Sequence, residues 1–230
     1  QSINLIKPTS IKTLAIIPLY QGEEFIANCL SSLENGTVKT HILLVDNAYS
    51  DQYTHLVEHQ FKNVIFIKNK KNLGFGKAIN QGFSYGLQNN YTHYLILNQD
   101  VELQHDTLQK MLDFASQLDQ NEWGIICPWN LGSDAKQTEY YFEENLSKRA
   151  GKTIQSNLYG SNVLKVDFIN AACWLVNSKA LEKLKGFDSR FFMYGEDLDF
   201  CNRAKYFGYK IYVLLDVKCF HHKLKGDYEN

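Results

Sequence analysis

The sequence has no excess of charge of either sign and no long apolar run. Its 230 residues include 24 Lys and Arg against 25 Asp and Glu, for a net charge of −1. A nearly neutral chain has no long-range field to attract nucleic acid or an anionic membrane, so we expect no nucleic-acid partner. No apolar stretch approaches the ~18 residues that cross a membrane, and no signal peptide is recognisable. We therefore expect a cytoplasmic protein that is at most peripheral to the inner face of the membrane.

The five cysteines suggest neither a disulfide framework nor a metal motif. Their number is odd, they are widely scattered, and no two stand at the spacing of metal ligands. Four of them sit in apolar runs, which predicts buried free thiols in a reducing compartment. Because the net charge is only −1, an anionic ligand would have to be held by local groups, such as a metal, a helix N-terminus or a single lysine.

Short apolar runs alternate with amphipathic segments as far as residue 127. The apolar runs, each predicted as a buried strand, cover residues 13–18, 41–45, 64–67, 94–97 and 124–127. The segments with helical spacing cover residues 23–33, 53–61, 77–89 and 106–118. This alternation, with strands too apolar for a one-sided sheet, predicts an α/β fold with a parallel sheet and right-handed crossovers.

The pattern weakens in the second half of the chain. Residues 130–163 are polar and weakly periodic, and we interpret them as a variable, partly ordered excursion. A strand with a kink is expected over residues 166–176, then a helix over 199–207 and a last strand over 210–215. Without an internal repeat or a low-complexity tract, residues 1–230 are expected to form a single domain.

Polar clusters follow three of the predicted strands, at residues 20–23, 46–51 and 98–100. Open α/β sheets bind ligands in the crevice at the carboxyl ends of their strands. We therefore expect these three clusters to lie together and to line a binding site.

Three carboxylates, Glu196, Asp197 and Asp199, stand within four positions beside an aromatic run, 191–194. Carboxylates in a half-apolar setting are costly unless they pair, bind metal or move protons. One held beside aromatic walls is suited to act as a general base toward a hydroxyl. The alternative is a helix N-terminus, where carboxylates face the positive end of the helix dipole. The cluster alone leaves both interpretations open.

A second candidate group joins Asp100, at the end of a buried strand, to His221 and His222, after the last strand. An imidazole and a carboxylate make a plausible pair of ligands for a divalent metal. Adjacent side chains on an extended segment point opposite ways, so only one histidine can face a site. The alternatives are a helix cap for Asp100 and a packing or surface role for either histidine.

Taken in order, the motifs resemble the inverting family 2 glycosyltransferases of GT-A fold, and most of all their rhamnosyltransferase-like branch. The motifs are Pro18 at a strand end, Val45-Asp46-Asn47-Ala48-x-x-Asp51, Asn72-Leu73-Gly74-Phe75-Gly76-x-Ala78-x-Asn80-x-Gly82, Leu97-Asn98-Gln99-Asp100, and the single motif from Gly186-Phe187-Asp188 through Glu196-Asp197-x-Asp199-x-Cys201-x-Arg203, followed by a strand and histidine. Five motifs in this order are strongly specific. The resemblance implies a Rossmann-like, mostly parallel central sheet flanked by helices. Residues 12–127 would form the nucleotide-sugar-binding half, and residues 128–226 the acceptor and catalytic half.

The resemblance implies a nucleotide-diphosphate sugar as donor. The donor-binding residues that it assigns are Pro18, Tyr20, Glu23, Asp46, Asn47, Asp51, Asn72, Gly74, Phe75, Lys77, Asn98 and Gln99. A carboxylate at Asp46 would accept a hydrogen bond from the base. Glycines in the 72–76 loop would permit close approach to the phosphates, and the helix that follows would favour their charge.

The resemblance also implies Mg²⁺ or Mn²⁺, bound by Asp100 and His221, with His222 as the second choice. Asn98 stands where the family's metal motif has its first Asp, so Asp100 alone of that tripeptide is expected to ligate. Gln99 departs from the commoner Pro or Asp.

For catalysis, the resemblance assigns Asp197 as the base and Glu196 as its partner. Asn170, Trp174 and Tyr194 are expected to contact the acceptor or to stack on a sugar.

The implied activity is transfer of a sugar, with inversion, from a dTDP-rhamnose-like or UDP-sugar donor to a hydroxyl of a glycan or lipid-linked acceptor in surface polysaccharide synthesis. One alternative is a non-catalytic nucleotide-sugar or carbohydrate-binding module, which would have no need of a base. Another is a nucleotidyltransferase, which would be expected to have a basic, glycine-rich first loop. Residues 19–23 are neither.

Overall fold

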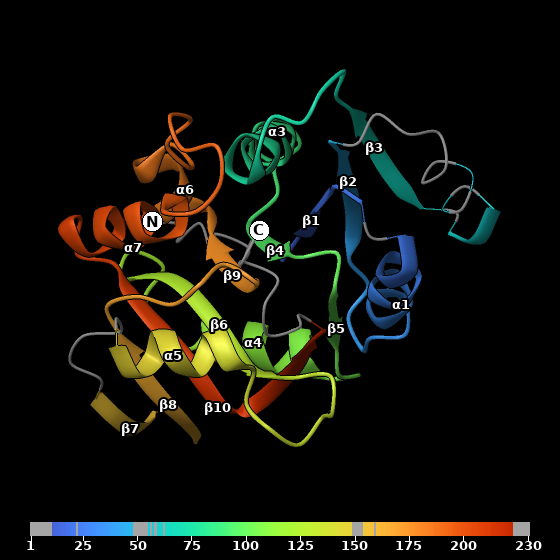
Figure 1. The fold of residues 1–230 in the computed structure, drawn as a ribbon. Coiled ribbons are helices and arrows are strands. Elements are labelled where there is room, and N and C mark those ends of the chain that lie inside the picture. Colours follow the sequence, from blue (N-terminus) through green and yellow to red (C-terminus); the bar gives the residue numbers. More distant parts are fainter. Residues whose placement is uncertain are drawn as a thin grey trace, which may run out of the picture.

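The computed structural model describes residues 11–21, 23–47, 55, 57, 59–61, 63–148, 154–158 and 160–222. Its strands are β1 (Thr13–Leu19), β2 (His41–Asp46), β3 (Val64–Lys68), β4 (His93–Leu97), β5 (Val101–Leu103), β6 (Trp123–Leu131), β7 (Ile154–Leu158), β8 (Ser161–Val166), β9 (Cys173–Asn177) and β10 (Lys210–His221). Its helices are α1 (Glu23–Glu34), α3 (Phe75–Gln88), α4 (Thr107–Ser116), α5 (Tyr140–Lys148), α6 (Ser178–Leu184) and α7 (Glu196–Tyr206). One sheet forms the centre, and helices flank it (Figure 1).

The ten strands of the described residues form this sheet in the order β3-β2-β1-β4-β9-β6-β10-β8-β7, with β5 pairing on β10. β3, β2, β1 and β4 pair in parallel, and β6 and β10 do the same. β9 lies between these two blocks and is antiparallel to both of its neighbours, so the six strands all run in one direction. The mostly parallel sheet flanked by helices, expected from the sequence, is confirmed.

The central strands are buried on both faces. Along β1, Ala15 and Ile17 belong to one hydrophobic cluster with α1 and α4, whereas Leu14 and Ile16 belong to a second with α3, α6 and α7. Successive side chains of a strand point to opposite faces, so a strand covered on both sides needs apolar residues at every position. Because β1, β2 and β4 are parallel, their carboxyl ends meet at one edge of the sheet.

The elements predicted before residue 127 are found wherever the structure describes them. All five strands are present, and the helices predicted over residues 23–33, 77–89 and 106–118 match α1, α3 and α4 within a few residues. The helix predicted over residues 53–61 lies largely outside the described residues. The sequence does not predict β5, because its three residues are too few to show a period.

The second half differs more from the expectation. Residues 130–163 contain α5, β7 and the beginning of β8, which add an antiparallel hairpin to the sheet. Only two side chains of β8 are fully buried, Val163 and Val166, so its sequence stays polar and hides the strand. The single strand expected over residues 166–176 is in fact β8 and β9, separated by a loop. Among the described residues, every helix is too short or too polar to cross a bilayer.

Candidate active site

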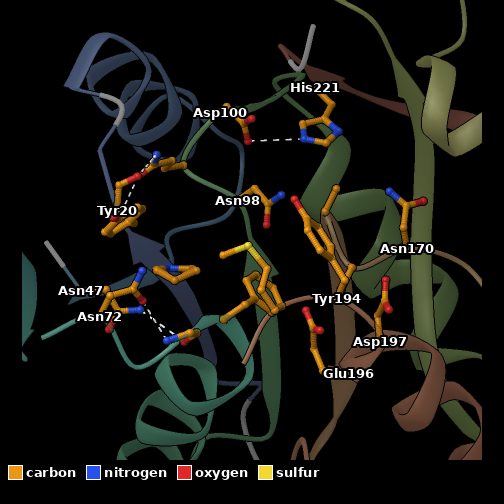
Figure 2. A pocket seen from close by; sticks show the side chains of 17 residues that line it. Tyr20, Asn47, Asn72, Asn98, Asp100, Asn170, Tyr194, Glu196, Asp197 and His221 are labelled. Carbon is orange, nitrogen blue, oxygen red and sulfur yellow. Dashed lines mark hydrogen bonds and ion pairs between the residues drawn. The ribbon is translucent and has the colours of Figure 1, made fainter. Parts of the chain in front are cut away.

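A cavity opens at the carboxyl ends of β1 and β4, where loops from both halves of the chain meet (Figure 2). Residues from every expected cluster line it: Pro18, Tyr20, Asn47, Asn72, Gly74, Phe75, Asn98, Gln99, Asp100, Asn170, Tyr194, Glu196, Asp197 and His221. The lining also includes Ala171, Ala172 and Met193, which the sequence does not single out. The convergence expected from the strand ends is therefore present.

Several expected site residues lie elsewhere. Trp174 is fully buried, packs against Phe187 and Phe200, and donates from its indole nitrogen to the Asn170 carbonyl at 2.9 Å. The expectation that Trp174 stacks on a sugar is therefore wrong, because a core side chain has no free face. Its hydrogen bond instead shapes the backbone of the cavity wall at Asn170.

On the donor side, the structure places two expected residues, Asp46 and Lys77, outside the cavity lining of the described residues. Asp46 is buried at the end of β2, and Lys77 is exposed on α3. Asp51 lies outside the described residues, and so does the side chain of Glu23.

Asn47 organises the glycine loop. Its amide nitrogen donates to the Gly74 carbonyl at 3.3 Å, and its amide oxygen accepts from the side chain of Asn69 at 2.9 Å. Asn69 in turn exchanges two hydrogen bonds with Gln81 of α3. This buried amide network ties the loop to the helix that follows it, so the loop is presented to the cavity in one conformation.

Gly74 is required by its surroundings. Its φ is +83°, a left-handed value, and an added Cβ would overlap the carbonyl of Phe192. The Phe75 amide donates to that same carbonyl at 3.3 Å. The glycine loop and the aromatic segment before α7 are thereby brought into backbone contact, which no motif spacing reveals.

Gln99, which departs from the family pattern, has a structural role. Its side-chain oxygen accepts from the Tyr20 amide at 3.1 Å, and its nitrogen donates to the Tyr20 carbonyl at 3.1 Å and to the Gln21 carbonyl. These bonds join the loop after β1 to the end of β4. A Pro or Asp could not make this pair of bonds.

His221 and His222 face different environments, as two neighbours on a strand must. The Nε2 atom of His221 lies 3.4 Å from Asp100 Oδ1, beside the cavity (Figure 2). His222 pairs with Glu102 at 2.8 Å and stacks on Phe25. The pairing of β10 with β5, His221 opposite Val101, sets this register.

The His221 ring lies between two carboxylates. It is only 2 % exposed, with Asp100 on its Nε2 side and Glu139 Oε2 3.9 Å from Nδ1. Burial lowers the pKa of the ring, but the two carboxylates outweigh burial and raise it to about 9. Negative surroundings that favour a proton on the ring favour any cation there.

A divalent ion fits these residues. Neither ring nitrogen of His221 has a hydrogen-bond partner among the described residues, and Nε2 points toward the Asp100 carboxylate. A buried imidazole nitrogen without a partner, beside a carboxylate, is a suitable pair of donors for Mg²⁺ or Mn²⁺. Within the described ranges, no group of three or more His, Cys, Asp or Glu side chains could hold the ion by itself. The other coordination positions would therefore fall to a ligand and to water.

The carboxylate cluster forms the first turn of α7. The helix begins at Glu196 instead of Asp199, after Gly195 with φ +91°. Asp199 pairs with Arg203 at 2.7 Å, and Arg203 also donates to the carbonyls of Leu184 and Gly186. Asp199 therefore serves the packing of α6 and α7, and it is not a free acid.

Asp197 and Glu196 both line the cavity. Asp197 accepts from the amide of its neighbour Leu198 at 2.8 Å, within the first turn of α7. Glu196 is 6 % exposed, and its Oε2 has no hydrogen-bond partner among the described residues. Burial, with a smaller contribution from Asp197, raises the pKa of Glu196 to about 6. Both acids point toward the cavity (Figure 2).

Glu139 is the polar residue of this region that sequence reasoning missed. It lies in the segment interpreted as a variable excursion, and it is 2 % exposed. An isolated Glu before a weak amphipathic run carries no signal of its own. Only the folding of β10 beside this segment brings it to His221.

Comparison with known proteins agrees with this architecture. Residues 14–185 match the profile described as Glycosyl transferase family 2. The low-salt glycan biosynthesis hexosyltransferase Agl10 of Haloferax volcanii is 23 % identical over 214 residues, covering 87 % of this chain and 64 % of Agl10. The N-acetylglucosaminyl-diphospho-decaprenol L-rhamnosyltransferase of Mycobacterium tuberculosis is 25 % identical over 228 residues, covering 89 % and 74 % of the two chains.

A solved structure shows the same fold. S. aureus TarS 1–349 superposes with a TM-score of 0.70 at 18 % identity, covering 92 % of this chain and 60 % of TarS 1–349. The present chain thus spans just under two thirds of the length of Agl10 and of this structure. The expected GT-A fold is confirmed by this likeness. Because the family profile covers well over half of the sequence, the chain belongs to glycosyl transferase family 2.

Proposed function

We propose that the protein is a metal-dependent, inverting glycosyltransferase. It moves a sugar from a nucleotide-diphosphate sugar to a hydroxyl of a glycan or lipid-linked acceptor, in the synthesis of a surface polysaccharide. The observation that carries this proposal is the convergence of Asp100, His221 and Asp197 on one cavity from distant parts of the sequence. A module that only binds a nucleotide sugar would have no use for a carboxylate at the rim beside a candidate metal pair.

The donor phosphates would lie between the glycine loop and the metal pair. No side chain caps the N-terminus of α3 in the described residues. The Phe75 amide already donates to the Phe192 carbonyl, so an anion there would be met by the amides that follow Phe75 and by the positive end of the helix. Asp100 and His221 would hold Mg²⁺ or Mn²⁺, which when bound would offset the charge of the leaving diphosphate. The nucleotides bound in structures of similar fold support a nucleotide-sugar donor. One such structure contains UDP-GlcNAc, and another contains UDP with Mn²⁺.

Asp197 would act as the base. As the acceptor oxygen attacks the anomeric carbon, Asp197 takes the proton of the hydroxyl, and the bond from that carbon to the diphosphate oxygen breaks on the opposite side. One displacement of this kind inverts the anomer. Glu196 lies beside Asp197. Its carboxyl, which is almost fully buried, would keep the floor of the site polar. Asn170 and Tyr194, which line the same cavity, would contact the sugars.

The names of the related proteins suggest which donor sugar and which acceptor the protein uses. Their names point to rhamnose or another hexose as the donor sugar, and the mycobacterial relative acts on a diphospho-decaprenol. With such an acceptor the protein would work as a peripheral protein at the inner face of a membrane.

Release of nucleoside diphosphate tests the proposal. The protein is incubated with dTDP-rhamnose or UDP-GlcNAc and a panel of saccharide acceptors, with and without Mn²⁺. We expect release of the nucleoside diphosphate, and we expect this release to require both the acceptor and Mn²⁺. Binding without turnover would indicate a non-catalytic module, and release of pyrophosphate would indicate a nucleotidyltransferase; either result overturns the proposal.

A further inference from the structure

Glu139 is a buried carboxylate with two sets of neighbours. It precedes the first residue of α5, and its two oxygens accept from the backbone amides of Tyr141 at 3.0 Å and Phe142 at 2.7 Å. On the other side, its Oε2 lies 3.9 Å from Nδ1 of His221. The carboxylate is thus held by the N-terminus of α5 and faces the histidine that we place at the metal.

The surroundings of Glu139 are rigid. Its own amide donates to the Asn130 carbonyl at 3.0 Å, on β6. Phe142, three residues further on, is fully buried and packs edge-to-face against Trp129 with ring centroids 5.2 Å apart. The carboxylate therefore has little freedom to turn away from His221.

A carboxylate beside one ring nitrogen has a definite effect on the other. It favours the tautomer with the proton on Nδ1, which leaves the lone pair on Nε2, and it restrains the rotation of the ring. Here Nε2 is the atom that faces Asp100 and the cavity. The separation of 3.9 Å is longer than a hydrogen bond, so the interaction at this distance is electrostatic.

We propose that Glu139 is a positioning residue of the metal site: held by α5, its carboxylate orients His221 through Nδ1, so that Nε2 is presented with Asp100 to the cation. This inference rests on the proposed metal-dependent function. It links α5, in the acceptor-side half of the chain, to the ion that would bind the donor diphosphate.

A merely structural role for Glu139 is the competing explanation, because the residue also caps α5. Two substitutions separate the roles. Glu139→Ser removes the carboxylate but keeps a side chain that can cap α5, because serine accepts hydrogen bonds from first-turn amides. Glu139→Gln keeps the length of the side chain and one capping oxygen but not the charge. Glu143→Gln is the matched control, because it removes a carboxylate from the same helical turn at an exposed position.

The readout is the affinity for Mn²⁺ in the presence of UDP, measured from the electron paramagnetic resonance of free Mn²⁺. Both Glu139 variants are expected to bind Mn²⁺ about 10- to 100-fold more weakly, and Glu143→Gln to match the parent. Thermal unfolding of each variant shows that it is folded. Parent-like affinity in Glu139→Ser and Glu139→Gln overturns the inference. A parent protein that binds no Mn²⁺ overturns the metal-dependent function itself, and the inference with it.

The proposed orientation of the His221 ring can also be measured on the parent protein, without any Glu139 variant. With ¹⁵N-labelled histidine and Mg²⁺ plus UDP, the His221 ring is expected to carry its proton on Nδ1, assigned by the loss of its signals in His221→Gln. A proton on Nε2 instead contradicts the proposed orientation, whatever the stability of the variants.

Discussion

The side chain of Asn80 holds the peptide of Phe187 from both directions. Its nitrogen donates to the Phe187 carbonyl at 2.8 Å, and its oxygen accepts from the Phe187 amide at 2.8 Å. Asn80 lies on α3, which follows the glycine loop, and Phe187 begins the segment that leads to Glu196 and Asp197. This side chain, together with the bond from the Phe75 amide to the Phe192 carbonyl, therefore holds the proposed donor loop and the proposed catalytic carboxylates at a fixed distance.

Asn80→Ala would leave both backbone groups of Phe187 without their partner. Each unsatisfied group costs about 1–3 kcal/mol, so the free energy of unfolding is expected to fall by at least that amount. Asn80→Asp keeps the acceptor and loses the donor, and should lie between the parent and Asn80→Ala. Denaturant unfolding measures this, with Ser84→Ala as the exposed control on the same helix. A change in Asn80→Ala no larger than that of Ser84→Ala would show that the clamp contributes nothing.

Asp197→Asn tests the base. The amide keeps the size and the hydrogen bond to Leu198 but takes no proton at neutral pH. Sugar transfer is expected to fall by ~10²–10⁴-fold, with nucleotide and Mn²⁺ binding unchanged. The control is Asp167→Asn, which removes a surface carboxylate paired with Lys205. Transfer near the parent rate would make the cluster a helix N-terminus and nothing more.

Asp100→Ala tests the metal pair. A ligand that binds only the folded state stabilises it by about 2.7 kcal/mol at 100 times its dissociation constant. We expect UDP with Mn²⁺ to raise the melting temperature of the parent, and this metal-dependent part to vanish in Asp100→Ala. His221→Ala should show the same loss, and His222→Ala a milder one, because His222 contacts Glu102 and Phe25 away from the cavity. The reverse order of the two histidines would assign the metal to the other face of β10.

Gly74→Ala and Gly208→Ala form a matched pair. Both glycines have left-handed φ values, +83° and +84°, but an added Cβ meets the Phe192 carbonyl at Gly74 and nothing within 4 Å at Gly208. Both variants carry the backbone strain, and only Gly74→Ala carries the overlap. Thermal unfolding should show an additional loss of about 1–3 kcal/mol for Gly74→Ala. Equal losses would mean that the aromatic segment shifts away at no cost.

His93 makes the folded state sensitive to acid. Burial lowers its pKa from 6.5 to about 4, and the ring stacks on Trp123. The folded state disfavours the charged ring, so its contribution to stability is complete above pH 6.5 and is lost as the pH falls toward 4. The loss amounts to at most about 3 kcal/mol. His93→Phe keeps the stacking and should flatten the stability curve between pH 6.5 and 4; an unchanged curve would contradict the assignment.

Much of the fold of residues 12–127 follows from local sequence. The continuous apolar runs at residues 13–18 and 41–45 require burial on both faces, which parallel strands between two helical layers provide. The turn and polar residues after them, such as Asn47 and Asn98, then meet at one edge of the sheet. These inferences hold because strand period, chain direction and crossover handedness are local or general properties.

Other features depended on contacts between distant segments. Tryptophan is a residue type that can stack on a sugar. Trp174 is nevertheless a core residue, because β9 inserts between β4 and β6. The choice of His221 over His222 depends on the register of β10 against β5.

The sequence by itself determined the residue types that the chemistry needs and the order in which they follow their strands. Tertiary structure alone decided which of them face one another: the Asn80 clamp, the Gly74 approach to Phe192, and Glu139 beside His221. The reason is physical. Propensity and periodicity act over a few residues, whereas side-chain contacts between segments about a hundred residues apart depend on how the whole sheet is paired and covered.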